Sequence, residues 1–201
     1  NALVLIPLLL AHKLQDGPAI LLGLLAALLF SLCASSVYVL NDLLDLESDR
    51  RHPDKRRRPF ASGALPIHLG ICLIPLLFAA AFVPAIVLLP RAFTMMLGAY
   101  ALLTTAYSLA LKRMVMLDVL TLASLYVLRI VAGGAATTTL VSPWLLAFSM
   151  FFFLSLAFIK RYSEIRDAGS DEQLDGRGRG YRFDDASLIL SLGPASGYMS
   201  V

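Results

Sequence analysis

The chain has 201 residues, of which 58% are hydrophobic and only 15% are charged, and its mean hydropathy is +0.76. Soluble domains are about 45–50% apolar and about 25% charged, so this composition excludes a soluble globular protein. The net charge of +3 comes from arginines in the loops, which orient a membrane protein and do not indicate a nucleic-acid partner. We therefore expect an all-α protein, a polytopic transmembrane helical bundle.

Seven apolar segments follow one another along the chain, separated by polar loops. We expect them at Ala2–Ala11, Pro18 to about Ser48, Leu65–Leu89, Ala92–Leu111, Leu117 to about Ala136, Pro143 to about Arg166, and from about Asp184 to Val201. Pro75 and Pro84 are expected to kink the third segment. The chain begins and stops inside apolar sequence, so we expect residues 1–201 to form a single transmembrane domain that is truncated at both ends.

The charged residues divide unequally between the two ends of these segments. The loops after the second, fourth and sixth segments hold fourteen of the seventeen Lys and Arg residues, and they also hold every acidic residue except Asp16. The positive-inside rule makes this face cytoplasmic. We expect a multi-pass integral protein of the inner or plasma membrane, with its active face in the cytoplasm.

An acidic motif ends the second segment. Asp42, Asp45 and Asp49 stand at positions i, i+3 and i+7, so on one continuous helix they would form a stripe about 10 Å long, with Asn41 beside it. Carboxylates at a membrane boundary indicate a function. Because carboxylate oxygens are hard ligands, a few of them beside bound phosphates are typical of a Mg²⁺ site.

A basic run from Arg50 to Arg58 follows the acidic motif. Such a run after a membrane span often serves only as an anchor, and this alternative stays open for most of its arginines. Its cations, among them Lys55 and Arg58, are also suited to phosphate oxygens. Acidic residues for a metal beside basic residues for phosphate suggest a site for a diphosphate bridged by Mg²⁺.

Further candidate residues lie at the same face or inside the bundle. Tyr107, Lys112 and Asp118 bracket the turn between the fourth and fifth segments. Lys112 is a candidate for binding phosphate, whereas Tyr107 either donates a hydrogen bond or belongs to the interfacial aromatic belt. Arg129 lies near the middle of the fifth segment, where an unpaired cation is costly, so it must face the bundle interior or a wet cavity.

A third group, Lys160, Arg161 and Glu164, ends the sixth segment. Lys160 and Arg161 are candidates for holding phosphates. Lys160 and Glu164 are also spaced as an i, i+4 pair, so mutual stabilisation is the simpler alternative for these two.

Taken together, these motifs resemble the UbiA superfamily of intramembrane prenyltransferases. The resemblance rests on Asn41-Asp42-x-x-Asp45-x-x-x-Asp49, His52-Pro53-x-Lys55-x-x-Arg58-Pro59, Ala61-Ser62-Gly63, Tyr107, Leu111-Lys112, Leu117-Asp118-Val119, Leu128-Arg129 and Ala132-Gly133. It implies nine helices around a central cavity, about seven of them in this fragment, and two acidic motifs that hold Mg²⁺ and a diphosphate. Catalysis would then depend on Asp42, Asp45 and Asp49 as metal ligands and on Lys112.

One departure points to a branch of the family. Where most members have a second aspartate-rich motif, this chain has Lys160-Arg161-Tyr162-Ser163-Glu164, which is similar to the branch that includes decaprenyl-phosphate phosphoribosyltransferase. That branch transfers phosphoribosyl from phosphoribosyl pyrophosphate to a polyprenyl phosphate. The substrate-binding residues would be Asn41, Lys55, Arg58, Tyr107, Asp118, Arg129, Lys160, Arg161 and Glu164.

Two alternatives stay open. The first is an ordinary prenyltransferase, which moves a polyprenyl group from its diphosphate to an aromatic acceptor. The second is a transporter for a lipid phosphate, which would need charges near the bilayer midplane at interrupted helices, and only Arg129 fits that description.

Overall fold

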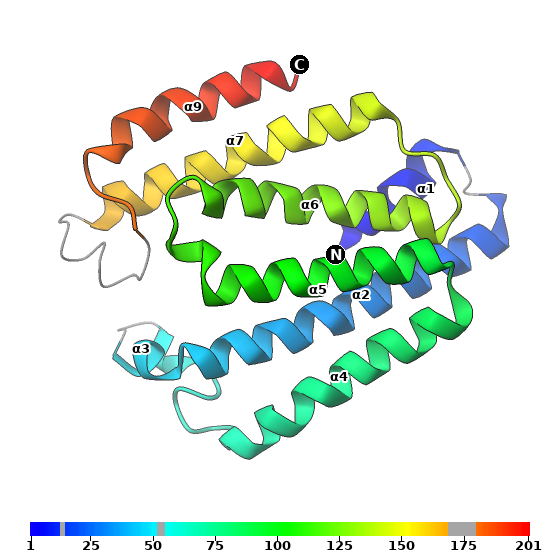
Figure 1. The fold of residues 1–201 in the computed structure, drawn as a ribbon, viewed down its shortest axis with the longest axis horizontal. Helices are drawn as coiled ribbons and strands as arrows, with labels where there is room; N and C mark the ends of the chain where they lie inside the picture. The colour runs from blue at the N-terminus through cyan, green and yellow to red at the C-terminus, as the bar shows by residue number, and fades with distance from the viewer. Residues whose placement is uncertain (13–14, 52–54, 169–179) are drawn as a thin grey trace.

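The computed structural model describes residues 1–12, 15–51, 55–168 and 180–201, and these residues form helices joined by loops, without a β-strand. Figure 1 shows the long helices lying side by side. In chain order the elements are η1 (Ala2–Leu5), α1 (Ile6–Leu10), α2 (Gly17–Leu44), α3 (Leu46–Arg51), η3 (Lys55–Arg57), α4 (Ile67–Leu88), α5 (Arg91–Leu109), η4 (Leu111–Arg113), α6 (Leu117–Ala136), α7 (Pro143–Ala168) and α9 (Asp185–Met199). His52 and Pro53, which contribute to the family resemblance, lie outside the described residues.

Five of these helices, α2, α4, α5, α6 and α7, are long and apolar enough to cross a membrane. The predicted class, an all-α polytopic bundle, is therefore confirmed. The sequence also gave the bounds of α6 correctly and those of α4, α5 and α7 to within two residues. Pro75 and Pro84 both lie inside α4, as expected.

The second segment differs from the prediction, because it is not one helix through Ser48. Helix α2 ends at Leu44, Asp45 forms a turn with φ −92° and ψ 8°, and α3 begins at Leu46. A helix of 28 residues is about 42 Å long, whereas the hydrocarbon core of a bilayer is about 30 Å thick. The break thus falls beyond the apolar layer, where water and side chains can satisfy backbone groups.

The first apolar segment, Ala2–Ala11, is also not one continuous helix. It forms the 3₁₀ turn η1 and the short helix α1, and Val4 of η1 is buried. Val4 lies against Gly133 of α6 so closely that a Cβ atom built on Gly133 would lie 1.9 Å from the Val4 carbonyl oxygen. Only a glycine at position 133 permits this contact.

Two groups of buried apolar residues form the core, and α6 contributes to both. One joins α2, α4, α5 and α6 and includes Phe30, Leu97 and Tyr100, with small residues where helices approach closely. The other joins α6, α7 and α9 and includes Phe158 and Ile189. Helix α6 therefore fixes the position of α9 relative to α2.

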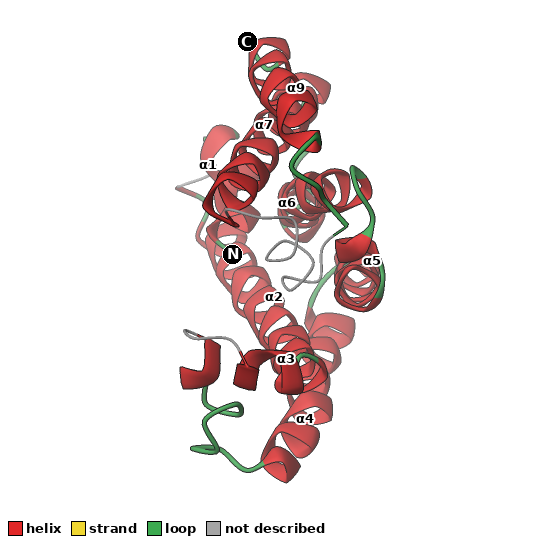
Figure 2. Cartoon of the chain, turned by 90° about the vertical axis from the view of Figure 1, so that its left-hand side faces the viewer, coloured by secondary structure: helices red, strands yellow, loops and turns green. Residues whose placement is uncertain are grey.

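The polar connections gather at one end of the bundle. In Figure 1, α3, the turn between α5 and α6, the end of α7 and the start of α9 all lie at the left. The connections from α4 to α5 and from α6 to α7 lie at the right. Figure 2 shows the molecule from the left-hand end, with α9 at the top and α4 at the bottom. The acidic and basic motifs thus share one end of the molecule.

The contact between η1 and α6 gives a matched pair of variants. We expect Gly133→Ala to destabilise the protein by about 1–3 kcal/mol, because the added methyl group forces η1 away from α6. Gly98→Ala, also inside a helix but with nothing within 4 Å of the new Cβ, should be neutral or stabilising by up to about 1 kcal/mol. Thermal unfolding of the purified protein in detergent measures both, and equal midpoints for the two variants would contradict this packing.

Candidate functional site

A single arginine bridges two of the three motif aspartates. Nη1 of Arg58 donates to Oδ1 of Asp42 at 2.9 Å and to Oδ2 of Asp49 at 2.8 Å. The Asp49 side chain is only 3% exposed, whereas the Asp42 and Arg58 side chains are 30% and 39% exposed. Because Asp42 ends α2 and Asp49 lies in α3, Arg58 holds the two helices together across the turn at Asp45.

The third aspartate has its own cation. Nζ of Lys112 donates to both carboxylate oxygens of Asp45, at 2.9 Å each. Lys112 comes from η4, between α5 and α6, and is 67 residues away in sequence. The structure therefore brings together Asp42, Asp45, Asp49, Arg58 and Lys112, which the sequence predicted for one site.

The loop that carries Arg58 is anchored on α4. Phe60 is buried, and a Cβ atom built on Gly70 would lie 2.9 Å from its ring and 3.1 Å from Leu43. The Arg58 carbonyl also accepts the N–H of Ser62 at 2.9 Å. Lys55, in η3 of the same loop, is half-buried. Packing of an aromatic ring against a glycine therefore sets the position of the Arg58 guanidinium.

The carboxylates of the motif do not form a complete metal site by themselves. Within the described part of the chain, no three His, Cys, Asp or Glu side chains converge closely enough to hold a metal ion by themselves. Protein sites for Mg²⁺ often supply only one or two carboxylates and leave the other positions to waters and substrate phosphates. One or two of the three motif aspartates would suit an ion of that kind, with phosphate oxygens and waters in the other positions.

A cavity of about 160 Å³ lies between α2, α5 and α6 and reaches Asn41, the residue before Asp42. Asn41, next to Asp42, lines it, and so does Arg129. The remaining lining residues are mostly aromatic or hydroxylated: Val37, Tyr38, Tyr100, Thr104, Tyr107, Ser108, Leu122, Leu125 and Tyr126. The structure thus places the predicted residues Asn41, Tyr107 and Arg129 around one space.

Arg129 meets only neutral partners in the contacts that the structure defines for it. Its guanidinium donates to the Tyr100 hydroxyl at 3.1 Å, to the Leu125 carbonyl at 2.8 Å and to the Asn1 side-chain oxygen at 3.1 Å. It also lies 5.1 Å from the centre of the Tyr126 ring. Its positive charge is therefore stabilised by neutral dipoles and an aromatic ring, without a carboxylate among these contacts.

Arg161 lies elsewhere, in a buried ionic cluster. Its Nη2 lies 2.7 Å from Oδ2 of Asp118, with side chains that are 1% and 0% exposed, and its Nη1 pairs with Glu164. The guanidinium lies beside the hydroxyl of Tyr107, a residue that lines the cavity, although Arg161 itself does not line it. Lys160 is exposed. Neighbouring helix residues point about 100° apart, so Lys160 and Arg161 cannot share one environment.

Tyr181 completes this cluster and was not expected from the sequence. Its hydroxyl donates to Oδ1 of Asp118 at 2.5 Å and accepts the N–H of Met116 at 3.2 Å. Met116 has a φ of +68° and precedes α6. Burial raises the pKa of Tyr181, and its hydrogen bond to Asp118 raises the pKa further, so the hydroxyl stays protonated as a donor.

Gly180 explains how Tyr181 reaches that position. A Cβ atom at residue 180 would lie 2.5 Å from the Arg113 carbonyl oxygen, so only glycine lets this segment lie against η4. The only sequence signal for this contact is the glycine before the tyrosine. The segment before α9 therefore supports the turn that carries Lys112.

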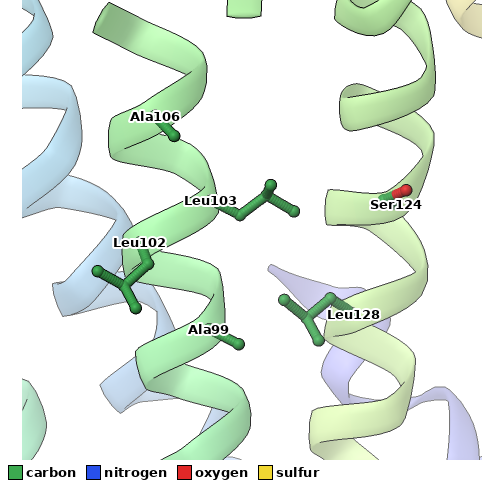
Figure 3. A pocket seen from close by; sticks show the side chains of 6 residues that line it. All are labelled: Ala99, Leu102, Leu103, Ala106, Ser124 and Leu128. Atoms are coloured by element: carbon green, nitrogen blue, oxygen red, sulfur yellow. The ribbon is translucent and has the colours of Figure 1, made fainter.

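A second, apolar groove opens on the outside of α5 and α6. Figure 3 shows its lining, which is Ala99, Leu102, Leu103, Ala106, Ser124 and Leu128. Leu102 is 75% exposed, as expected for a side chain that faces lipid. This groove carries one polar side chain, Ser124, and it contains none of the predicted site residues.

Removing one hydroxyl tests the Tyr181 contacts. We expect Tyr181→Phe to lower the free energy of unfolding by about 1–3 kcal/mol, because Asp118 then loses a buried donor. The control Tyr198→Phe, at a side chain that is 90% exposed, should change nothing. Since the folded-state pKa of Tyr181 is raised, this stabilisation should be fully present below the ordinary tyrosine pKa of about 10 and be lost only as pH rises through the folded-state value. Chemical unfolding at several pH values measures the difference, and wild-type stability in Tyr181→Phe would contradict it.

Comparison with known proteins identifies relatives of the chain. The chain is 38% identical over its whole length to the nodulation protein NoeC of Azorhizobium caulinodans, of which it covers 65%. Over 141 residues, which are 70% of the chain, it is 36% identical to the decaprenyl-phosphate phosphoribosyltransferase of Mycobacterium tuberculosis, of which it covers 46%. The chain thus spans less than two thirds of the length of either relative.

The fold is similar to that of a UbiA homolog from Archaeoglobus fulgidus, solved bound to DMAPP and Mg²⁺. The TM-score is 0.76 at 16% sequence identity, and the match covers 88% of this chain and 62% of the other. Residues 2–178 match the UbiA prenyltransferase family. Because that match covers most of the chain and the fold agrees with it, the protein belongs to the UbiA prenyltransferase family.

Proposed function

We propose that the chain is part of a Mg²⁺-dependent intramembrane transferase that moves phosphoribosyl from phosphoribosyl pyrophosphate to a polyprenyl phosphate and releases pyrophosphate. The observation that carries this proposal is the set of three carboxylates and two cations that pair with one another next to Asn41, which lines a cavity in the bundle. The similarity to decaprenyl-phosphate phosphoribosyltransferase favours this donor.

Each part of the site has a role in binding. Carboxylates of Asp42, Asp45 and Asp49 would hold Mg²⁺ together with the phosphates, and the ion would supply positive charge against the departing pyrophosphate. Lys112 and Arg58 are placed to bind its phosphate oxygens, since both already lie on the motif. Asn41 precedes Asp42 in the chain and lines the cavity, so it is placed to orient the sugar of the donor.

The reaction itself exchanges one bond at the sugar. An oxygen of the acceptor phosphate forms a bond to C1 of the ribose while the bond between C1 and the pyrophosphate breaks. C1 passes through oxocarbenium character, and a cavity lined by Tyr107, Leu122 and Tyr126 would limit the access of water that hydrolyses it. Arg129 supplies a positive charge deeper in the cavity for the anionic head of the acceptor.

The buried cluster supports the site without touching substrate. Arg161, Asp118 and Glu164 fix α6 and α7 relative to each other, and Arg161 positions the Tyr107 hydroxyl on the cavity wall. Lys160 and Lys55, which lie on the same face, contribute positive charge around the entrance. We place this face in the cytoplasm, in agreement with the positive-inside rule.

A second candidate is a prenyltransferase that acts on an aromatic acceptor. The four tyrosines that line the cavity favour it, because aromatic side chains suit a planar acceptor or an allylic cation. The similar fold of a protein solved with DMAPP also favours it.

A product assay separates the two candidates. Membranes that contain the full-length protein are offered radiolabelled phosphoribosyl pyrophosphate with polyprenyl phosphate, and in parallel an isoprenoid diphosphate with an aromatic acid. We expect Mg²⁺-dependent label in a lipid product only from the first pair. Turnover of the second pair alone would replace the phosphoribosyl proposal with the prenyl alternative.

Neutralising one motif carboxylate should abolish the reaction. We expect Asp45→Asn to reduce turnover by roughly 100-fold or more, because it removes a negative charge from the metal site. Glu47→Gln is the matched control, since Glu47 lies in the same stretch but is exposed. Folding of both variants is checked by size-exclusion chromatography in detergent. Full activity of a folded Asp45→Asn variant, or activity that persists in EDTA, would disprove the metal assignment.

Cysteine labelling tests the orientation of the site. In a Cys72→Ser background, with Cys33 buried, single cysteines replace Ser62 and Thr138, which are exposed at opposite ends of the bundle. In intact cells an impermeant thiol reagent should label position 138 and leave position 62 unlabelled, because the motif end faces the cytoplasm. The reverse pattern would place the active face outside.

A further inference from the structure

We infer that Arg58 and Lys112 keep free Mg²⁺ off the aspartates and release them only to a diphosphate, so that metal and diphosphate enter as a pair. This inference rests on the proposed function, because it assigns a binding order to the same site. It concerns two side chains whose role in the ligand-free protein differs from their role in the complex.

The two cations occupy the oxygens that a metal would use. Arg58 already contacts Asp42 and Asp49, and Lys112 contacts both oxygens of Asp45, all at 2.8–2.9 Å. An ion that bound these carboxylates in the ligand-free protein would therefore have to displace an ammonium or a guanidinium group. Both groups would stay close to it, held there by the anchored loop and by η4.

Charge makes that displacement unfavourable for the metal alone. Three carboxylates and two cations leave the motif with a net charge of −1. A free Mg²⁺ ion would gain little from a site of that charge, and it would face two cations whose partners it had just taken. The buried position of Asp49 adds to the effect, because Asp49 cannot exchange Arg58 for water without cost.

A diphosphate removes this obstacle. Its oxygens give Arg58 and Lys112 new anionic partners, and the carboxylates that they release become free to bind the metal. Every charge then has an opposite neighbour: carboxylates on the metal, and the metal and both cations on phosphate. Binding of the metal and binding of the diphosphate are therefore positively coupled, and each must raise the affinity for the other by the same factor.

The coupling can be measured without turnover. Mn²⁺ replaces Mg²⁺, and the paramagnetic signal of free Mn²⁺ reports its binding to the purified full-length protein in detergent. Pyrophosphate is the second ligand, and Asp45→Asn protein gives the baseline for complexes that form in solution. We expect wild-type protein to bind Mn²⁺ weakly in the absence of pyrophosphate. With pyrophosphate present, its affinity for free Mn²⁺ should rise by about tenfold or more.

Removing either cation should have opposite effects on the two ligands. We expect Arg58→Gln and Lys112→Gln to raise the affinity for Mn²⁺ alone, because the carboxylates are no longer occupied, and to lower both the affinity for pyrophosphate and the coupling. Arg57→Gln and Arg113→Gln, at exposed neighbouring arginines, are the matched controls and should behave as wild type. Lys112→Gln changes a pair whose carboxylate is 32% exposed, so it keeps the test open if Arg58→Gln does not fold.

The outcomes separate this inference from the proposed function. Wild-type protein that binds Mn²⁺ equally well with and without pyrophosphate would overturn the coupling while leaving the metal site intact, as would variants that lose affinity for both ligands. Wild-type protein that binds no Mn²⁺ under either condition, while still retaining pyrophosphate, would overturn the metal site and with it the coupling.

Discussion

Helix α2 is longer than a bilayer is thick, and this excess length brings carboxylates together at the membrane boundary, where they need counter-charges. The chain supplies these from two distant stretches, the loop before α4 and the turn η4. Arg58 holds α3 back against the end of α2, and Lys112 ties both to the α5–α6 turn. The acidic motif is therefore held by ion pairs to two other segments, and its geometry depends on charge neutralisation.

A second ionic cluster stabilises this arrangement from behind. Asp118 and Arg161 are almost fully buried, and hydrogen bonds to their other atoms lower the cost of burying such a pair. Tyr181 supplies one of these bonds and also holds Met116, four residues after Lys112. The segment before α9 thus supports the turn that carries Lys112, through contacts with the Met116 N–H and the Arg113 carbonyl.

Composition and hydropathy were sufficient to predict the helical class and the ends of α4, α5, α6 and α7 to within two residues, because burial in lipid imposes both. Helical spacing also identified the three aspartates, although it missed the turn at Asp45, which lies where lipid no longer imposes a helix. Helical spacing could not predict the surroundings of Arg161. A rotation of α7 by the 100° that separates adjacent residues decides whether a cation faces the cavity or the space between α6 and α7. Tyr181 was missed because no charge or helical spacing marks it in the sequence, and its contacts with Asp118 and Met116 appear only in the folded chain.

The central claim is that the cations on the motif move from carboxylate to phosphate when the diphosphate and its metal arrive. An experimental structure of the full-length protein with Mg²⁺ and pyrophosphate tests this most directly. The account predicts an ion bound to oxygens of the motif aspartates, with Nζ of Lys112 and the Arg58 guanidinium on phosphate oxygens. A pyrophosphate bound elsewhere, with Lys112 still on Asp45 and Arg58 still between Asp42 and Asp49, would contradict it.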